Sequence, residues 1–432
     1  MTASSLLPYR ILSLLILGLG CGNGNYGVVG EGTDLGPVTT RVDVQTYADL
    51  SQDISTIQQY IDQNEPAEGL GVFRDGQHSE VTPGVKRSLL SLANDMKTAD
   101  PKSPSYLFHL YGQADRALNL AFDTDKLDYI ANQIEQIFTT QPKFAVEAIW
   151  ILDMWMYATH VLYDGVYQCQ QRSRPDANPD LFDIGTAGFD KFIALWYGSG
   201  QTLAAENGNG LYKWAQALGN QFGTADPEAQ VNTRVNLLYQ EAVSIISVEG
   251  ACTNSNPGSA DRLWQLAVNM EQEMTKPLIQ GWIYYMQQND SDGVDVYSKA
   301  LVPQLAKCRP SLYKKLHESF ITGTFSNDPS FLTEIYNLVP DMTYCFGYSC
   351  GELGLTGIDA CQTHDVFKPT MAGYKPLTPV GNVSSGPISV SVCFLWWLTN
   401  RLTVVITSLH SSLGGCRRSR CVPNQDSGFS ES

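Results

Sequence analysis

Apolar residues recur at helical spacing through most of this chain, and that pattern restricts its fold more than any other feature. Strict alternation of apolar and polar residues, which a half-buried strand requires, is scarce. The sequence therefore predicts an all-α protein built from one or more helical bundles. The segments with helical spacing are 42–63, 85–99, 105–122, 125–139, 143–170, 186–197, 210–222, 230–248, 260–288, 294–307, 310–320 and 328–337.

Three local features refine this pattern. A loop is expected from about residue 64 to residue 83, with a turn in "GLGVFRDG". Gly198 directly follows a helical segment and is expected to cap its C-terminal end. Pro277 lies inside the segment 260–288 and should kink or split that helix, because proline lacks a backbone N–H and its ring clashes with the preceding turn.

The N-terminal residues have the pattern of an export signal. Arg10 precedes the apolar run Ile11–Gly20, and small residues follow. This run is too short to span a bilayer, so we predict a signal peptide over residues 1–20. The mature protein is then expected to be secreted, periplasmic or held at the cell surface.

The C-terminal region changes character after the helical body. A Pro/Gly/Ser-rich linker occupies residues 375–387. Ile388–Ser408 is about as long as a bilayer-spanning helix, and the short tail 409–432 carries the basic run "CRRSRC". We therefore predict a membrane anchor. Arg401 would be costly in lipid, and the alternative is a misassigned gene end.

Between these ends the chain divides into a helical part and a cysteine-rich part. Residues 42–340 form the expected helical domain, either as one body or as two halves that meet near residue 185. Residues 341–374 are expected to be irregular. Six cysteines suit three disulfides in an oxidising compartment, namely Cys169, Cys252, Cys308, Cys345, Cys350 and Cys361. Spacing leaves the connectivity open, but Cys252 and Cys308 bracket the helical pair 260–307 and are expected to lie close enough to pair.

Charge and motifs exclude several functions. Acidic residues outnumber basic ones 44 to 28, giving a net charge of −16, whereas nucleic-acid binding needs a basic stripe. The chain contains no GxSxG, HExxH or P-loop pattern. We therefore predict neither a nucleic-acid partner nor an enzyme.

One helical segment, "DMWMYATHVLYDGVYQC", concentrates potential metal ligands. In a regular helix, Asp153, Tyr157, His160, Asp164 and Tyr167 fall within an arc of about 80°. Phenolate, carboxylate and imidazole are the ligands that a hard cation such as Fe³⁺ should prefer. The alternative is a half-buried aromatic helix without metal. The opposite face should be core, and carries Ile151, Met154, Trp155, Ala158, Val161, Leu162 and Val166.

A single helix rarely completes a six-coordinate site, so a second segment must contribute. Tyr197 precedes a glycine turn and could point into a cleft, with Tyr212 facing it; the alternative is that both only pack the turn. We favour Tyr197 or Tyr285 as the additional ligand, and we expect Tyr157, His160, Asp164 and Tyr167 to line the cleft.

Three runs resemble the algal iron-assimilating protein family: "WMYATHVLYDGVYQC", "ALWYGSG…NGLYKWAQALGNQFGT…VNTRVNLLYQEAV" and "MTKPLIQGWIYYMQ". The resemblance covers roughly residues 105–322. It implies a low-iron-induced, phytotransferrin-like protein that takes part in ferric iron acquisition at the cell surface, with Fe³⁺ bound together with carbonate. The resemblance assigns no ligand residue by residue.

These observations favour a non-enzymatic ferric-iron-binding protein, with carbonate as a synergistic anion held by helix-terminal N–H groups or an arginine. A surface reductase or an uptake receptor would be its partner. Two alternatives remain: an extracellular structural or adhesive protein in which the tyrosines are core, and an imelysin-like secreted enzyme.

Overall fold

The computed structural model describes residues 32–98, 129–174, 184–256, 258–307, 310–320 and 345–354. These residues are mostly helical, which confirms the all-α prediction. The expected signal peptide, linker, membrane anchor and helices 105–122 and 328–337 lie outside the described residues. Within the described residues, no helix combines the length and the apolar character needed to cross a membrane.

The helices follow one another along the chain with one short hairpin among them. The α-helices are α1 (Gln45–Ala48), α2 (Leu50–Asp62), α3 (Pro66–Asp75), α4 (Leu89–Thr98), α6 (Tyr129–Thr140), α7 (Ala145–Ala148), α8 (Trp155–Arg172), α9 (Thr186–Tyr197), α10 (Leu211–Gln221), α11 (Gln230–Ile246), α12 (Gly258–Gln287), α13 (Ser291–Leu301) and α14 (Pro310–Phe320). Short 3₁₀ helices cover Pro142–Phe144 and Val302–Lys307, and a π-helical turn covers Ile149–Met154. The antiparallel strands are β1 (Glu80–Thr82) and β2 (Val85–Lys86).

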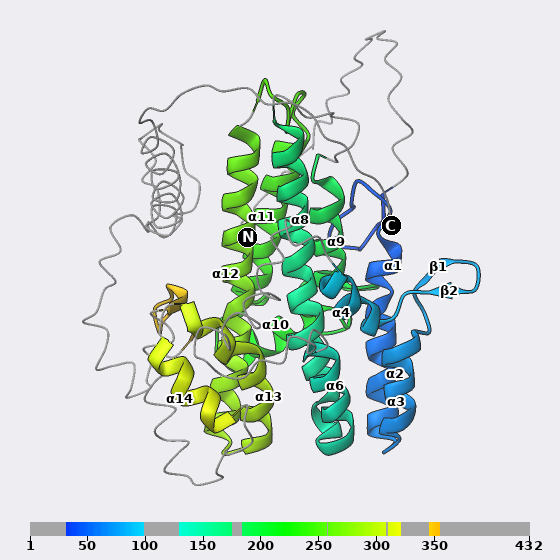
Figure 1. Ribbon diagram of the computed structural model, residues 1–432, viewed down its shortest axis with the longest axis vertical. Coiled ribbons are helices and arrows are strands. Elements are labelled where there is room, and N and C mark those ends of the chain that lie inside the picture. Colours follow the sequence, from blue (N-terminus) through cyan, green and yellow to red (C-terminus); the bar gives the residue numbers. More distant parts are fainter. Residues whose placement is uncertain are drawn as a thin grey trace, which may run out of the picture. The chain divides into compact units, whose positions relative to one another are not determined.

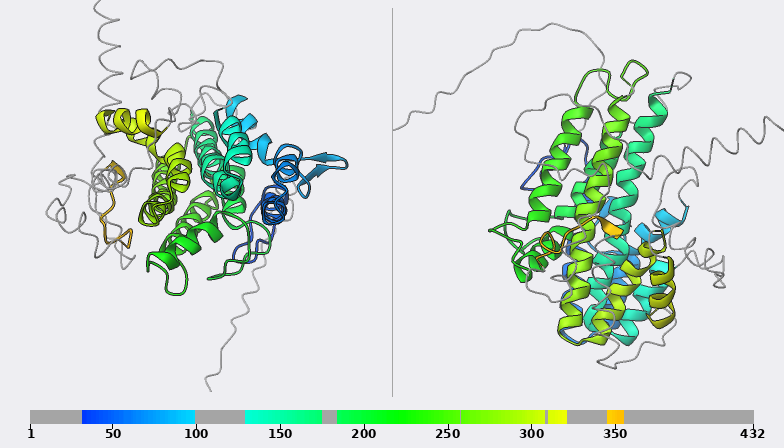
Figure 2. Two further views of the ribbon diagram at one scale, coloured as in Figure 1. Left: turned by 90° about the horizontal axis from the view of Figure 1, so that it is seen from below. Right: turned by 90° about the vertical axis from the view of Figure 1, so that its left-hand side faces the viewer.

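The long helices pack side by side. Helix α8 packs against α9 and α12, and α12 also packs against α11 and α13 (Figure 1). The β1–β2 hairpin projects from the helices, which is also visible in the view from below in Figure 2. A single hydrophobic cluster includes residues from both sides of residue 185, such as Trp155 and Trp196.

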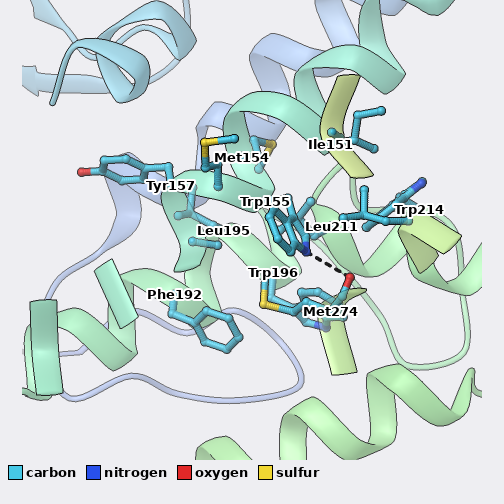
Figure 3. Packing of buried hydrophobic residues seen from close by; sticks show 14 of the residues in the cluster. Ile151, Met154, Trp155, Tyr157, Phe192, Leu195, Trp196, Leu211, Trp214 and Met274 are labelled. Atoms are coloured by element: carbon cyan, nitrogen blue, oxygen red, sulfur yellow. Dashed lines mark hydrogen bonds between the residues drawn. The ribbon is translucent and has the colours of Figure 1, made fainter. Parts of the chain in front are cut away.

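The apolar stripe expected on α8 and the turn before it is core. Trp155, Ala158 and Leu162 are fully buried, as are Ile151, Met154 and Val166. The indole of Trp155 donates to the carbonyl of Met274 on α12 at 3.0 Å (Figure 3). A stripe of this spacing buries one face of a helix, and here that face is held between α9 and α12.

The loop expected at 64–83 is wrong over its first half. Pro66–Asp75 forms α3, with Pro66 in the first turn, where its missing N–H costs nothing. Phe73 is fully buried, and Gly69 lets α3 approach the side chain of Phe138 on α6. Packing against α2 and α6 therefore outweighs the low helix propensity of two glycines. Gly76, with φ of 67°, ends the helix before the hairpin.

Pro277 does not split its helix, because α12 runs without interruption from Gly258 to Gln287. Pro277 is buried, and α12 packs against α8, α10, α11 and α13. Tertiary packing thus offsets the loss of one backbone hydrogen bond. The predicted cap is confirmed: Gly198 ends α9 with φ of 69°, a conformation that glycine adopts without strain.

The expected Cys252–Cys308 bridge is wrong, because Cys252 is bonded to Cys169 with a Cα–Cα distance of 4.9 Å. This bond joins the last turns of α8 to the loop between α11 and α12. The packing of α8 along α12 brings the two cysteines together, which sequence spacing could not show. Cys345 and Cys350 are also disulfide-bonded, whereas Cys308 and Cys361 lie outside the described residues.

Candidate metal centre

Tyr157 on α8 lies at the meeting point of three helices. Its hydroxyl donates to Asp95 Oδ2 on α4 at 3.3 Å. Its ring stacks on Tyr47 of α1, with centroids 6.3 Å apart and an interplanar angle of 15°. The His160 ring lies 5.7 Å away, one turn along α8. Figure 3 shows Tyr157 directed away from the core side chains around Trp155.

Asp153, one turn before Tyr157, is a fully buried carboxyl in the π-helical turn. Neither of its oxygens has a hydrogen-bond partner among the described residues. Burial raises the pKa of Asp153 well above its usual range, and the nearby Asp95 carboxylate raises this pKa further. Buried polar atoms in native proteins are almost always paired, and π-helical turns are frequent at functional sites. Asp153 is therefore the least expected polar group in the described structure.

The π-helical turn also changes the geometry assumed from sequence. The arc that grouped five donors used the 100° rotation of a regular α-helix. The i→i+5 turn at Ile149–Met154 departs from that rotation. Asp153 consequently belongs to the surroundings of Tyr157 through the shared neighbour Asp95, and not through a straight helical face.

Two cations flank these acidic and phenolic groups. The guanidinium carbon of Arg87 lies 4.1 Å from the centroid of the Tyr47 ring, and Lys191 Nζ lies 5.4 Å from the same centroid. Arg87 Nη1 is 3.5 Å from Asp95 Oδ2, the oxygen that accepts the Tyr157 hydroxyl. Burial, Tyr47 and Asp95 raise the pKa of Tyr157, and Arg87 opposes them. The phenol is therefore protonated at neutral pH.

The centre reaches from the surface into the interior. The Asp95 side chain is 49% exposed, whereas the Arg87 side chain is 17% exposed and Asp153 is fully buried. Asp95 thus stands between solvent and the buried groups. A cation that entered here would meet this carboxylate first.

The other ligands expected on α8 lie further along the helix. Asp164 and Tyr167 are half-buried, and Asp164 accepts a hydrogen bond from Gln168 at 3.5 Å. His160 is half-buried, but Tyr157 itself is only 4% exposed. The structure therefore brings Tyr157 and His160 into contact. Asp164 and Tyr167, the other residues expected to line the cleft, lie about one and two turns beyond His160 on α8.

Tyr197 and Tyr285, the two expected second-segment ligands, belong to other clusters. Tyr197 is fully buried and packs on Tyr212 with ring centroids 5.4 Å apart, and in the described structure its hydroxyl makes no hydrogen bond. Burial, Glu228 and Tyr212 raise the pKa of Tyr197. Tyr212 therefore faces Tyr197 as expected, but within the core.

Tyr285 lies at the junction of α7, α12 and α13. Its hydroxyl donates to the Glu147 carboxylate, at 2.7 and 2.8 Å from the two oxygens. Burial raises the pKa of Glu147 to about 7, although the bond from Tyr285 opposes the rise. Lys143 pairs with Asp290 nearby at 3.1 Å. The Tyr285 phenol is therefore hydrogen-bonded within this cluster, and it is not part of the surroundings of Tyr157.

Sequence reasoning missed Tyr47, Asp95, Arg87 and Lys191. All four lie within segments whose periodicity marked them only as helical, and in the structure Arg87 lies between β2 and α4. Tyr47, Asp95 and Arg87 come close to Tyr157, and Lys191 comes close to the Tyr47 ring, only because α1 packs on α9 and α4 packs on α8. No local motif carries that information, so only the tertiary structure identifies them.

The donor set suits a hard cation. Two phenols, two carboxyls and an imidazole supply mostly oxygen ligands, which Fe³⁺ prefers. Within the described ranges, no group of three or more His, Cys, Asp or Glu side chains is arranged for a metal ion. A metal centre around Tyr157 would therefore need the phenol oxygens of Tyr157 and Tyr47 among its ligands. The two unpaired oxygens of buried Asp153 fit such a use.

Comparisons with protein-family models, with curated proteins and with solved structures give no match for this chain. The function must therefore be argued from the chemistry of the site.

Proposed function

We propose that this protein is a non-enzymatic ferric-iron-binding protein of the cell surface or the extracellular space. The observation that carries the proposal is Asp153, a fully buried carboxyl with two unpaired oxygens that lies near Asp95, one turn before Tyr157. Burying such a group without hydrogen bonds costs on the order of a few kcal/mol. A bound cation would offset that cost, and the resemblance to the algal iron-assimilating protein family agrees with iron as the cargo.

The proposed ligands are the phenolates of Tyr157 and Tyr47 with the carboxylates of Asp95 and Asp153, and His160 is the nitrogen donor. Tyr157 is protonated in the metal-free protein, and the raised pKa of Asp153 favours its neutral form. Iron must displace these protons, so binding weakens in acid. Bicarbonate is the proposed synergistic anion. Release in an acidified compartment, to a surface reductase or an uptake receptor, follows from the same proton competition.

A structural or adhesive role is the second candidate, and one observation favours it. Tyr47, Tyr157 and Tyr197 are all buried, as core aromatics are. Under this alternative, Tyr157 stabilises the junction of α1, α4 and α8 and binds nothing.

A ferric titration distinguishes the two candidates. The full chain is titrated with Fe³⁺ nitrilotriacetate, with and without bicarbonate, while the visible phenolate-to-iron charge-transfer band is recorded. We expect a saturable band from the wild type and a weak or absent band from Tyr157→Phe. Tyr285→Phe is the matched control, because it removes a half-buried phenol that lies outside the centre.

A wild type that develops no band would refute iron binding by phenolates. A band that survives unchanged in Tyr157→Phe, and is lost instead in Tyr285→Phe, would move the site to the Glu147 cluster. If neither variant changes the band, the iron is bound elsewhere, and Tyr157 has the structural role.

A further inference from the structure

Arg87 holds a position that a metal ion would need. Its Nη1 lies 3.5 Å from Asp95 Oδ2, and Tyr157 donates to that same oxygen at 3.3 Å. Arg87 also lies close enough to the Tyr157 phenol to act on it electrostatically. In this structure, therefore, the guanidinium is the positive partner of the carboxylate and phenol that we propose as ligands.

The guanidinium does not satisfy its own hydrogen bonds there. Its Nε is buried and has no acceptor in the described part of the chain. Its guanidinium carbon lies over the Tyr47 ring, 4.1 Å from the centroid, in contact with the second proposed phenol ligand. An arginine placed for structure alone would normally use its fork of donors on fixed acceptors. Arg87 instead touches two proposed ligands while one of its donors is unpaired.

We infer that Arg87 is the resident cation of the metal-free centre, and that a metal ion binds by displacing it. The inference rests on the proposed function, since it concerns the same site. A tripositive ion on Asp95 Oδ2 and a guanidinium nitrogen 3.5 Å from that oxygen repel each other strongly, because water screens charges poorly in a partly buried site. The side chain must leave Asp95 and Tyr47 when the ion arrives.

Displacement of the Arg87 side chain also affects the β1–β2 hairpin. Arg87 follows β2 directly, and its backbone N–H donates to the carbonyl of Ser79, which precedes β1. The hairpin exposes Val81 and Val85 and packs little of its own surface. Withdrawal of the Arg87 side chain therefore loosens the base of an already exposed element. Metal occupancy is thereby signalled at the surface, where an uptake partner could sense it.

Two measurements on the full chain test this inference. The affinity for Ga³⁺, a redox-inert ferric substitute, is measured in the wild type, Arg87→Gln and Arg87→Lys by competition with a chelator. We expect Arg87→Gln to bind Ga³⁺ at least tenfold more tightly, and Arg87→Lys to fall between. Arg74→Gln is the matched control, because Arg74 pairs with Glu135 on the exposed faces of α3 and α6. Hydrogen exchange of residues 77–88 should increase when the wild type is loaded.

Each outcome decides the matter. Unchanged Ga³⁺ affinity in Arg87→Gln, with wild-type binding intact, overturns the inference and leaves the proposed function standing. Any loss of affinity in Arg87→Gln also overturns it, and a loss seen only with bicarbonate would show that Arg87 anchors the anion. Binding by Arg87→Gln but not by the wild type supports the displaced cation and removes the proposed function from the natural protein. Absence of binding in both removes both. Thermal unfolding of each variant confirms that it is folded.

Discussion

The Cys169–Cys252 disulfide should contribute several kcal/mol to the free energy of unfolding. The two cysteines are 83 residues apart. In the chain-entropy treatment, closing a loop of that length lowers the entropy of the unfolded chain by about 15 cal/mol/K, which corresponds to about 4.5 kcal/mol at 25 °C. Both sulfurs are fully buried, so the double replacement by alanine also removes packed atoms. Since domains are stable by about 5–15 kcal/mol, we expect the loss of a large share of the total.

Urea unfolding of Cys169→Ala/Cys252→Ala against the wild type measures this contribution. The midpoint should fall, the slope should rise because the unfolded chain without the bond is less compact, and the melting temperature should drop by about 5–8 °C. Thr253→Ala, which leaves the bond intact beside Cys252, is the control. A loss below about 1 kcal/mol would refute the entropy argument. Alkylation of both cysteines in the native protein without reductant would refute the bond itself.

Three further predictions concern the buried polar groups. Asp153→Leu should stabilise the metal-free protein at pH 7 by about 1–3 kcal/mol in urea, because an apolar side chain of similar size replaces a buried carboxyl that has no hydrogen-bond partner, and should weaken iron binding in the charge-transfer titration. Burial raises the pKa of Glu147 and of Glu271 from 4.5 to about 7. The contribution of each protonated carboxyl to the free energy of unfolding is therefore fully present below pH 4.5, and it is lost as the pH rises through 7. The free energy of unfolding measured in urea should therefore fall between pH 5 and pH 8 by up to about 3 kcal/mol per group, and Glu147→Gln should flatten the profile. Tyr239→Phe should lower the free energy of unfolding by about 1–2 kcal/mol, because it removes the 2.7 Å hydrogen bond to buried Asp190.

The helices could be predicted from sequence because their signal is local. The segment 186–197 was expected and α9 spans Thr186–Tyr197, since its apolar spacing and its glycine cap lie within one short stretch. The core stripe around Trp155 followed from the same periodicity. Helical periodicity predicts these elements well because each residue in the pattern contributes to the helix in which it lies. Pro277 marks the limit, since packing from other helices decided whether α12 continues.

The candidate centre could be predicted only in part because its contacts are not local. Tyr157 and His160 were found since they share one helix. Asp95 is 62 residues away from Tyr157 along the chain, and nothing in its own segment distinguishes it from an ordinary exposed aspartate. The Cys169–Cys252 bond has the same origin. Pairings of this kind depend on which helices pack together, and many packings are compatible with the same amphipathic pattern.

The contrast between two buried aspartates is the strongest argument that the region around Tyr157 is used for binding. Asp190 is fully buried, and its carboxylate accepts from the backbone N–H groups of Arg41 and Val42 and from the Tyr239 hydroxyl. Asp153 is buried just as fully, and none of the described residues donates to it. The fold provides three donors for the carboxylate of Asp190. Donors for Asp153, or an apolar residue in its place, would be compatible with the same packing. Instead the fold leaves Asp153 unpaired, in a π-helical turn, with the unpaired Nε of Arg87 in the same region. Three local departures from the most stable arrangement meet near one phenol, which is expected where stability has been exchanged for a binding site.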